Sequence, residues 1–280
     1  MLEKPTKKEP APRLLDGKAA LVTGAAGAIG CGVCQVLLEN GCRLTVSDLA
    51  GPKLDDFTRE IGAPAPERVR SLAMDVTDKE SVAAGFQAVL AQWGRLDIIV
   101  HNAGIALVSK LVDMDLESFR RLERVNIEGT LLVLAEAGRV LAQQGRGGDI
   151  VIMSTKNVPS PSAGFGAYSA TKAACHQLGR IASLEFAPHD IRVNMVAPDA
   201  VFAEGKFKSG LWAEVGADRM KARGLDEKGL REYYRGRNLL KAAVTGRHVG
   251  NAVLFLVSRQ TPTTGATIPV DGGLPDATPR

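Results

Sequence analysis

The sequence predicts an α/β fold in which a doubly wound parallel sheet of seven strands carries helices on both faces. Short apolar runs alternate along the chain with longer segments whose apolar residues recur at helical spacing. This alternation is typical of βαβ units around a parallel sheet. The first apolar run also leads directly into a glycine-rich turn and then into a helical segment, as the first unit of such a sheet does.

The expected elements follow one another in a regular order. Apolar runs predict strands at 19–22, 43–47, 69–73, 98–101, 150–153, 191–195 and 267–270. Helical spacing predicts helices over 30–40, 78–93, 116–143 and 169–186. The exception is 202–240, which is rich in charge and glycine and too long for a simple crossover. We expect it to form a substrate lid, inserted between the sixth strand and the last helix.

Length and composition predict one domain behind a short tail. The chain has 280 residues, 45% of them hydrophobic, which is enough to bury one substantial core. Residues 1–13 are dominated by lysine, glutamate and proline, and we expect them to form a flexible tail. The remainder, 14–280, is expected to form a single domain that includes the lid.

The charge pattern excludes several classes of partner. The formal net charge of +4 comes from 35 basic and 31 acidic residues, with no basic block outside the extreme N-terminus. We therefore expect no nucleic-acid and no membrane partner. The N-terminal residues lack the apolar run of a secretory signal, and no stretch approaches the ~18 consecutive apolar residues of a membrane-spanning helix. A soluble, cytoplasmic protein is expected.

Four cysteines raise the question of a metal or redox site. Cys31 and Cys34 form a C-x-x-C pair, but the pair lies inside an expected helix, and neither a second pair nor a histidine cluster supplies further ligands. Small buried cysteines are ordinary core residues. We expect all four to pack in the core and expect no metal site.

The glycine-rich turn predicts a cradle for a diphosphate. Gly24 permits a tight turn, Gly27 allows close approach of a phosphate to the backbone, and Gly30 lets the helix pack against the strand. Asp48 ends the second strand, where a carboxylate can accept hydrogen bonds from both adenosine ribose hydroxyls. Strand, turn, helix and acid in this order are typical of the Rossmann fold, although a plain glycine-rich turn and a turn-starting aspartate are the alternatives.

The same region indicates which dinucleotide binds. A carboxylate at Asp48 repels the additional ribose phosphate of NADP. No arginine follows Asp48 immediately, and the glycine-rich turn contains no basic residue. The expected cofactor is therefore NAD.

A tyrosine and a lysine four residues apart predict acid–base chemistry. Tyr168 and Lys172 open an expected helix, so their side chains share one helix face. A phenol with a pKa of ~10 is a poor base at neutral pH, but a neighbouring cation, helped by the positive charge of nicotinamide, stabilises the phenolate and lowers that pKa. Tyr168 can then take the proton of an alcohol while a hydride leaves the carbon. A tyrosine and a lysine at this spacing more often form an ordinary surface pair. The surrounding motifs therefore decide whether this pair is catalytic.

The motifs occur in the order seen in short-chain dehydrogenase/reductases, which the chain resembles over roughly 14–273. They are TGAAGAIG at 23–30, Asp75-Val76, HNAG at 101–104, Asn126, Ser154-Thr155, YSATK at 168–172 and VDGG at 270–273. The resemblance implies one Rossmann catalytic domain and a catalytic tetrad, carried over to Asn126, Thr155, Tyr168 and Lys172. Ser154 is the alternative to Thr155, because the family commonly has a serine thirteen residues before the tyrosine, where this chain has Thr155.

The resemblance also implies the groups that contact the cofactor. Asp75 and Val76 are expected beside the adenine, and 102–104 beneath the adenosine ribose. The full set of expected cofactor-binding residues is Gly24, Gly27, Ala28, Ile29, Gly30, Asp48, Asp75, Val76, Asn102, Ala103, Gly104, Tyr168, Lys172, Pro198 and Val201. Family members usually form tetramers, so a homotetramer is expected.

Two positions depart from the family pattern. His101 stands where an asparagine usually precedes Asn-Ala-Gly, and we expect a packed histidine at a strand end. Asp199 follows Pro198 where glycine is usual, which puts a charge near the reaction site. This carboxylate either holds a substrate hydroxyl or caps the lid.

Polar residues around the expected site predict a small hydroxylated substrate. Lys156 and Asn157 follow Thr155 directly, and with Thr155 and Asp199 they are the candidate substrate-binding residues. The tracts at 154–157, 198–201, 224–241 and 270–280 resemble the dehydrogenase half of bifunctional rhamnulose-phosphate aldolase/alcohol dehydrogenases and related sugar or deoxy-sugar-acid dehydrogenases. A polyol, sugar, sugar acid or hydroxyaldehyde is the expected substrate. The alternatives are an NADPH-dependent 3-oxoacyl or ketone reductase, and an inactive NAD-binding sensor or scaffold.

Overall fold

The structure is a computed structural model that describes residues 13–203, 205, 207 and 210–275. Most of the expected tail, four positions of the expected insertion and the last five residues lie outside the described residues. The strands are β1 (Ala19–Thr23), β2 (Arg43–Asp48), β3 (Val69–Ala73), β4 (Ile98–His101), β5 (Gly148–Met153), β6 (Ile191–Pro198) and β7 (Thr267–Val270). They pair in the order β3-β2-β1-β4-β5-β6-β7, and every neighbouring pair is parallel. The predicted seven-stranded sheet is confirmed.

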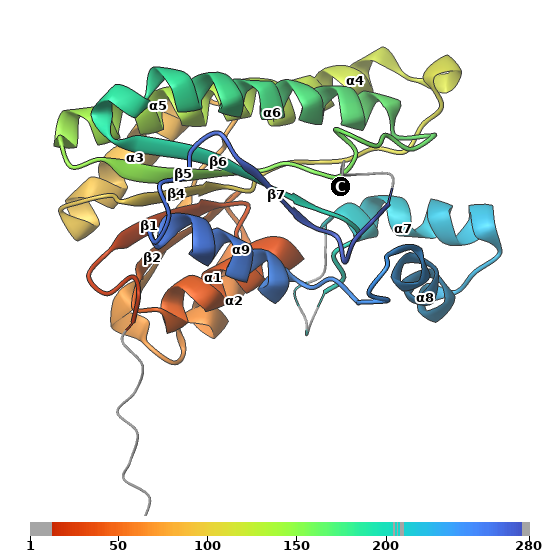
Figure 1. Cartoon of the computed structure of the whole chain (residues 1–280), viewed down its shortest axis with the longest axis horizontal. Helices are drawn as coiled ribbons and strands as arrows, with labels where there is room; N and C mark the ends of the chain where they lie inside the picture. The colour runs from red at the N-terminus through yellow and green to blue at the C-terminus, as the bar shows by residue number, and fades with distance from the viewer. Residues whose placement is uncertain (1–12, 204, 206, 208–209, 276–280) are drawn as a thin grey trace, which may run out of the picture.

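Helices cover the two faces of the sheet in separate layers (Figure 1). One layer holds α1 (Ala28–Glu39), α2 (Pro52–Gly62) and α9 (Gly246–Val257), and the other holds α3 (Lys79–Trp93), α5 (Gly129–Gln144) and α6 (Gly166–Glu185). Because successive strand residues face opposite sides, Val22 packs into the first core and its neighbour Leu21 into the second. Within the part of the chain that is described, no helix is both long and apolar enough to cross a membrane.

The helix expected over 116–143 is interrupted. It consists of α4 (Leu116–Leu122), the π-helical segment η3 (Glu123–Glu128) and α5. The wider π turn carries Asn126, whose side chain is fully buried. Apolar spacing could not reveal the interruption, because the chain stays helical and amphipathic through it. Single π turns inside α-helices occur frequently at functional sites.

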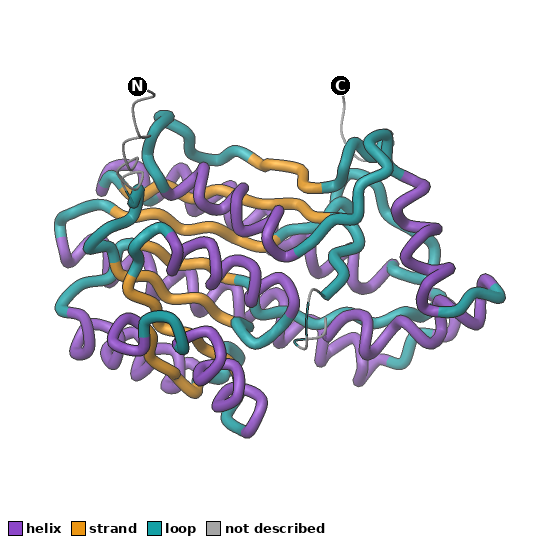
Figure 2. Tube along the Cα trace, turned by 90° about the horizontal axis from the view of Figure 1, so that it is seen from below, coloured by secondary structure: helices purple, strands orange, loops and turns teal. Residues whose placement is uncertain are grey.

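The expected insertion forms two helices beyond the carboxyl ends of the strands (Figures 1 and 2). These are α7 (Gly210–Arg223) and α8 (Glu227–Arg237). Aromatic side chains join them to the end of β6: the rings of Phe202 and Trp212 stack at 4.8 Å between centroids, and the Trp212 and Tyr234 rings meet edge-on at 5.1 Å. Three short 3₁₀ helices complete the chain, η1 (Pro66–Arg68), η2 (Leu111–Asp113) and η4 (Ala187–His189).

All four cysteines are buried and unbridged, as their expected packing role requires. Burial raises the pKa of the Cys34 thiol well above its ordinary value and that of Cys42 to about 12, so both stay protonated at neutral pH. Among the residues that the structure describes, no group of three or more His, Cys, Asp or Glu side chains could hold a metal ion.

Helices α1 and α9 pack with their backbones in contact, because glycines line their interface. A Cβ atom on Gly32 of α1 would overlap the carbonyl group of Gly246, and one on Gly250 would lie 2.6 Å from the carbonyl oxygen of Gly32. No side chain could occupy either position without moving backbone. This contact holds α1 in place, and with it the glycine-rich turn from which α1 starts.

His101 joins the ends of β1 and β4 to the helix that carries Asn126. Its Nδ1 lies 3.1 Å from the Thr23 hydroxyl, and its Nε2 lies 3.0 Å from the Thr130 hydroxyl. Thr130 donates to the backbone oxygen of Asn126 at 2.6 Å, so it accepts from Nε2, and the imidazole is neutral with its proton on Nε2. Burial, with a smaller contribution from Lys172, lowers the His101 pKa to about 3. The predicted packed histidine is therefore a member of a buried hydrogen-bond chain.

We predict that Gly32→Ala lowers the free energy of unfolding by about 1–3 kcal/mol or more, because the new methyl group must displace the backbone of α9. Gly236→Ala in α8 is the matched control. Nothing lies within 4 Å of a Cβ at Gly236, so the better helix propensity of alanine should raise stability by up to ~1 kcal/mol. Urea unfolding followed by circular dichroism measures both, and equal effects at the two positions would contradict the backbone contact.

The neutral His101 predicts acid sensitivity. The unfolded chain binds a proton at this histidine with a pKa near ~6.5, whereas the folded protein does so only near about 3, so stability falls as the pH drops below about 6.5. Between about pH 7 and about pH 5 the loss is about 2 kcal/mol from this group. Unfolding free energies of the wild type and His101→Asn at both pH values test this. A wild type and variant with the same pH dependence would show that His101 does not cause it.

Candidate active site

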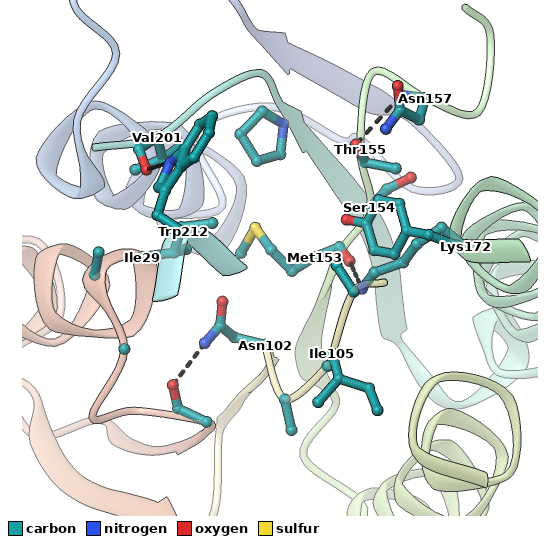
Figure 3. Close-up of a pocket in the computed structure, with 18 of the residues that line it drawn as sticks. Ile29, Asn102, Ile105, Met153, Ser154, Thr155, Asn157, Lys172, Val201 and Trp212 are labelled. Carbon is teal, nitrogen blue, oxygen red and sulfur yellow. Dashed lines mark hydrogen bonds between the residues drawn. The ribbon is translucent and has the colours of Figure 1, made fainter. Parts of the chain in front are cut away.

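A single continuous cavity of about 690 Å³ follows the carboxyl edge of the sheet. It begins at the end of β2, passes the loops after β1 and β4, and ends between β5, α6 and the helices of the insertion. Figure 3 shows Ile29 and Val201 across this cavity from Thr155 and Lys172. Most of the residues predicted from sequence line it: Gly24, Gly27, Ala28, Ile29, Asp48, Asp75, Val76, Asn102, Ala103, Gly104, Ser154, Thr155, Lys156, Asn157, Tyr168, Lys172, Pro198, Asp199 and Val201.

The glycine-rich turn has the shape of an anion cradle. Gly24 has a φ of +60°, and a Cβ there would lie 2.8 Å from the Ala103 Cα. Gly27 is the N-cap of α1, and no side chain caps this helix, so its first amides face the cavity without a side-chain acceptor. Gly30 does not line the cavity; its missing side chain lets α1 approach the carbonyl oxygen of Ala25. The turn therefore fits a diphosphate at a helix N-terminus.

Asp48 and Lys53 mark the far end of the cavity. One Asp48 oxygen accepts a hydrogen bond from the Ala26 amide at 3.2 Å, and the other accepts from the Leu49 amide at 2.9 Å. The Lys53 ammonium lies 3.7 Å from the Asp48 carboxylate, and its side chain is 60% exposed. The sequence argument for NAD relied on the absence of a basic residue near Asp48. The structure brings one there from the first turn of α2, five positions further along the chain.

The loop after β4 forms the floor between the two ends. The Asn102 amide side chain donates to the Gly24 carbonyl oxygen at 2.8 Å, which joins this loop to the glycine-rich turn (Figure 3). A Cβ on Gly104 would lie 3.1 Å from the Lys172 ammonium and 3.2 Å from the Asn126 side-chain oxygen. On the adjacent wall, the Asp75 carboxylate accepts from the amide and hydroxyl of Thr77.

Tyr168 and Thr155 meet in the wall formed by α6 and the end of β5. The Thr155 side chain is near enough to the Tyr168 phenol to favour its phenolate, and the Thr155 oxygen accepts from the Asn157 amide at 3.2 Å. Ser154 points elsewhere, because its hydroxyl lies 3.0 Å from His176 Nδ1. Of the two hydroxyls left open by the sequence, that of Thr155 is the one beside the Tyr168 phenol.

Burial dominates the titration of this pair. It raises the Tyr168 pKa to about 12, and the hydrogen bond with Thr155 opposes it only in part. Lys172 is buried too, which lowers its pKa, and its ammonium donates to the Met153 carbonyl oxygen at 2.9 Å. The protein's own groups alone do not lower the Tyr168 pKa, because burial disfavours the phenolate more than Thr155 favours it. The expected lowering also included the positive charge of nicotinamide.

Asn126 supports the site without lining the cavity. Its side-chain nitrogen donates to the Ile105 carbonyl oxygen at 2.9 Å and to the Thr171 hydroxyl at 3.0 Å. Its side-chain oxygen accepts from the Ile105 amide at 3.0 Å. All of these contacts are internal, so the asparagine holds the floor of the cavity against α6, the helix that carries Tyr168 and Lys172.

The end of the cavity beyond Tyr168 is strongly polar. The Lys156 ammonium donates to the Ser162 hydroxyl at 2.7 Å, and Asn157 lines the cavity beside it. Asp199 is buried, which raises its pKa, while Arg237 and Lys156 act in the opposite direction. The Trp212 indole donates to the Val201 carbonyl oxygen at 2.8 Å and covers this end (Figure 3).

Several residues of the lining were not singled out in the sequence. Among them are these basic and aromatic residues: Lys53, Arg121, Phe165, Trp212, Arg219, Arg223, Tyr233, Tyr234 and Arg237. Besides Trp212, five of these residues come from helices α7 and α8 of the charged insertion. The four-residue spacing of Arg219 and Arg223 signals a shared helix face, but only the packing of α7 over the sheet edge shows which way that face points.

Comparisons with known proteins agree with this arrangement. A family model described as "Enoyl-(Acyl carrier protein) reductase" matches residues 24–275. The chain is 34% identical over 265 residues to the uncharacterized oxidoreductase YuxG of Bacillus subtilis, covering 94% of this chain but only 38% of that protein's length. It is 35% identical over 190 residues to a sorbitol dehydrogenase of Cereibacter sphaeroides, covering 68% of this chain and 73% of the relative. It is 30% identical over 265 residues to the human L-xylulose reductase, and the match covers 92% of this chain and 97% of the relative.

Solved structures of similar sequence have the same fold as this chain. A short-chain type dehydrogenase/reductase from Mycobacterium ulcerans superposes with a TM-score of 0.81 at 28% identity, covering 93% of this chain and 90% of the other. The matched family model covers the glycine-rich turn, the Tyr168–Lys172 pair and the insertion. The chain therefore belongs to the short-chain dehydrogenase/reductase family and is an oxidoreductase of that family.

Proposed function

We propose that this protein transfers a hydride between a secondary alcohol of a small polyol, sugar, sugar acid or hydroxyaldehyde and NAD, with Tyr168 as the general acid and base. One observation carries the proposal. The hydroxyl of Tyr168 is buried against the Thr155 hydroxyl in a cavity that also contains Lys172 and the glycine-rich turn. A proton acceptor and a diphosphate cradle thus line the same cavity.

The residues present fit a dinucleotide along the cavity. The uncapped N-terminus of α1 would hold the diphosphate, and Asp48 would accept hydrogen bonds from the adenosine ribose. Asp75 and Val76 would lie beside the adenine, and Lys172 would hold the nicotinamide ribose. When bound, NAD supplies the hydride acceptor and a positive charge on its ring.

The chain's own groups perform the proton transfer. The Thr155 and Tyr168 hydroxyls would bind the substrate oxygen together, and Tyr168 would take its proton during oxidation. Since burial holds the Tyr168 pKa at about 12, positive charge near the phenol is needed to favour the phenolate, and the Lys172 ammonium is positioned on the same helix face to contribute. In reduction the same phenol returns the proton.

Asn126 would act as a positioning residue. Its side chain is fully engaged with Ile105 and Thr171, so it fixes the distance between the cavity floor and α6. The polar groups of Lys156, Asn157 and Asp199 at the far end support a hydroxylated substrate over a steroid or long acyl chain. Similarity to a sorbitol dehydrogenase and an L-xylulose reductase supports the same substrate class.

A homotetramer remains a prediction. Apolar side chains on the outer faces of α5 and α6 support it: Leu131 is 52% exposed and Leu184 is 76% exposed. Exposed apolar groups on neighbouring long helices are typical of a surface that another subunit covers.

The catalytic assignment predicts distinct effects at three hydroxyls. Tyr168→Phe should reduce kcat for alcohol oxidation by about 10²–10⁴-fold, and Thr155→Val should also lower it strongly. Ser154→Ala should cost much less, because that hydroxyl pairs with His176. Steady-state kinetics, with NAD binding measured separately by fluorescence, give the comparison. A larger loss for Ser154→Ala than for Thr155→Val would reverse the assignment.

The pH dependence follows from the same residue. Oxidation needs the basic form of Tyr168, whose fraction rises with pH below its pKa, so kcat/KM for oxidation should rise up to about tenfold per pH unit between about pH 6 and about pH 9. Reduction needs the protonated phenol and should not rise over this range. A flat oxidation profile in the wild type would argue against Tyr168 as the base.

The cofactor assignment predicts opposite changes at two neighbouring residues. Asp48→Ser removes the carboxylate and leaves the Lys53 ammonium, so the ratio of kcat/KM for NAD over NADP should fall by about tenfold or more. Lys53→Ala removes the cation that would attract the additional phosphate, so the ratio should rise. A wild type that prefers NADP would contradict the assignment directly.

A further inference from the structure

Three arginines converge on the end of the cavity beyond Tyr168. Arg219 and Arg223 come from one face of α7, and Arg237 comes from the end of α8. All three line the cavity that contains the Tyr168 phenol. With Lys156, they place four cationic side chains around this end, where Asp199 is the acidic side chain among the described lining residues.

Each arginine is held by an aromatic ring. The guanidinium carbon lies 4.2 Å from the Phe165 ring centroid for Arg219, 4.7 Å from that of Tyr233 for Arg223, and 5.2 Å from that of Tyr234 for Arg237. Stacking fixes the plane of a guanidinium group but uses none of its N–H donors. The donors therefore remain free to bind a ligand in the cavity.

The arrangement is costly unless an anion is present. Burial lowers the Arg219 pKa, Tyr234 and Tyr233 act in the opposite direction, and the neighbouring Arg223 and Arg237 add to the lowering. In the described part of the chain, the buried Arg219 Nε has no hydrogen-bond partner. No described carboxylate forms an ion pair with any of the three guanidinium groups. Cations that repel one another in a partly buried space are stabilised when an oxyanion enters.

From these contacts, and resting on the proposed function, we infer that the substrate is a hydroxylated compound with an anionic group, a carboxylate or a phosphate, which Arg219, Arg223 and Arg237 bind. Arginine favours both groups because its planar fork of donors matches their oxygens. Phe165 relates this subsite to the chemistry, since its ring lies against Arg219 and has its centroid 5.9 Å from that of Tyr168. The anionic group is therefore held a short carbon chain away from the reacting alcohol, and Asp199 is left to accept a hydrogen bond from a substrate hydroxyl.

Matched ligands test this inference. Sorbitol, gluconate and the phosphate ester of sorbitol share a hydroxylated carbon chain and differ at one end, and shorter polyols with their acids and phosphates extend the panel. Binding to the protein without cofactor is measured by isothermal titration, and oxidation is measured with NAD. We expect the anionic members to bind at least about tenfold more tightly than their neutral counterparts, as charge-assisted hydrogen bonds predict. A preference for acids or for phosphates identifies which oxyanion the subsite takes.

Variants locate the effect. Arg219→Gln and Arg237→Gln should each reduce the anionic-over-neutral preference by about tenfold or more. Arg231→Gln is the matched control, because Arg231 also stacks on an aromatic ring, that of Phe202 at 4.9 Å, but pairs with Glu227 and does not line this cavity. It should keep the preference. Circular dichroism checks folding, and a fall in anion affinity of the wild type with rising salt provides a test that needs no variant.

The outcomes separate this inference from the proposed function. Neutral polyols that bind and react as well as their anionic counterparts would overturn the anionic subsite and leave the dehydrogenase proposal standing. Anions that bind through the arginines, with no member of the panel oxidised, would support the subsite and contradict the hydride transfer. Equal losses of preference in Arg231→Gln and Arg237→Gln would also overturn the assignment to this cavity.

Discussion

The site depends on a buried line of hydrogen bonds that crosses the molecule at the carboxyl ends of β1 and β4. It runs from Thr23 through His101 and Thr130 to Asn126, and from the Asn126 side chain to Thr171 in α6. Thr23 also accepts from the amides that begin the loop after β4. The glycine-rich turn and the helix of Tyr168 are therefore joined by groups that do not line the cavity. Because every member is buried, replacing one leaves its neighbours without partners in a place that water reaches poorly.

The two ends of the cavity differ in the charge they present. At the end of β2 the Asp48 carboxylate accepts from two backbone amides, and the exposed Lys53 ammonium lies beside it. At the other end the cationic side chains outnumber Asp199. Between them the helix N-terminus of α1 offers amides rather than charges. The distribution of charge along the cavity therefore favours a ligand whose own charges complement those at each end.

Local patterns predicted most of the frame, and long-range packing determined the rest. The glycine-rich turn and the Tyr168–Lys172 pair could be recognised because each depends on spacing within one strand–turn–helix unit or one helix face. Lys53 could not be assigned to Asp48 from sequence, because the turn into α2 folds it back. The π turn at Asn126 preserves an amphipathic pattern and therefore gives no signal. The Tyr168 pKa also depends on burial, which a sequence does not display and which acts against the positive charges that the expectation considered.

The close contact of α1 with α9 has a consequence for how the chain matures. Helix α1 follows the first strand, whereas α9 comes after the sixth strand and the insertion, so the glycines that pack one helix against the other lie far apart in the sequence. Until α9 emerges from the ribosome, one side of α1 is left without its covering helix, and the nucleotide-binding half stays incomplete although all its own residues have been made. The support of the glycine-rich turn is therefore a long-range contact, which forms only after the residues of α9 have been added to the chain.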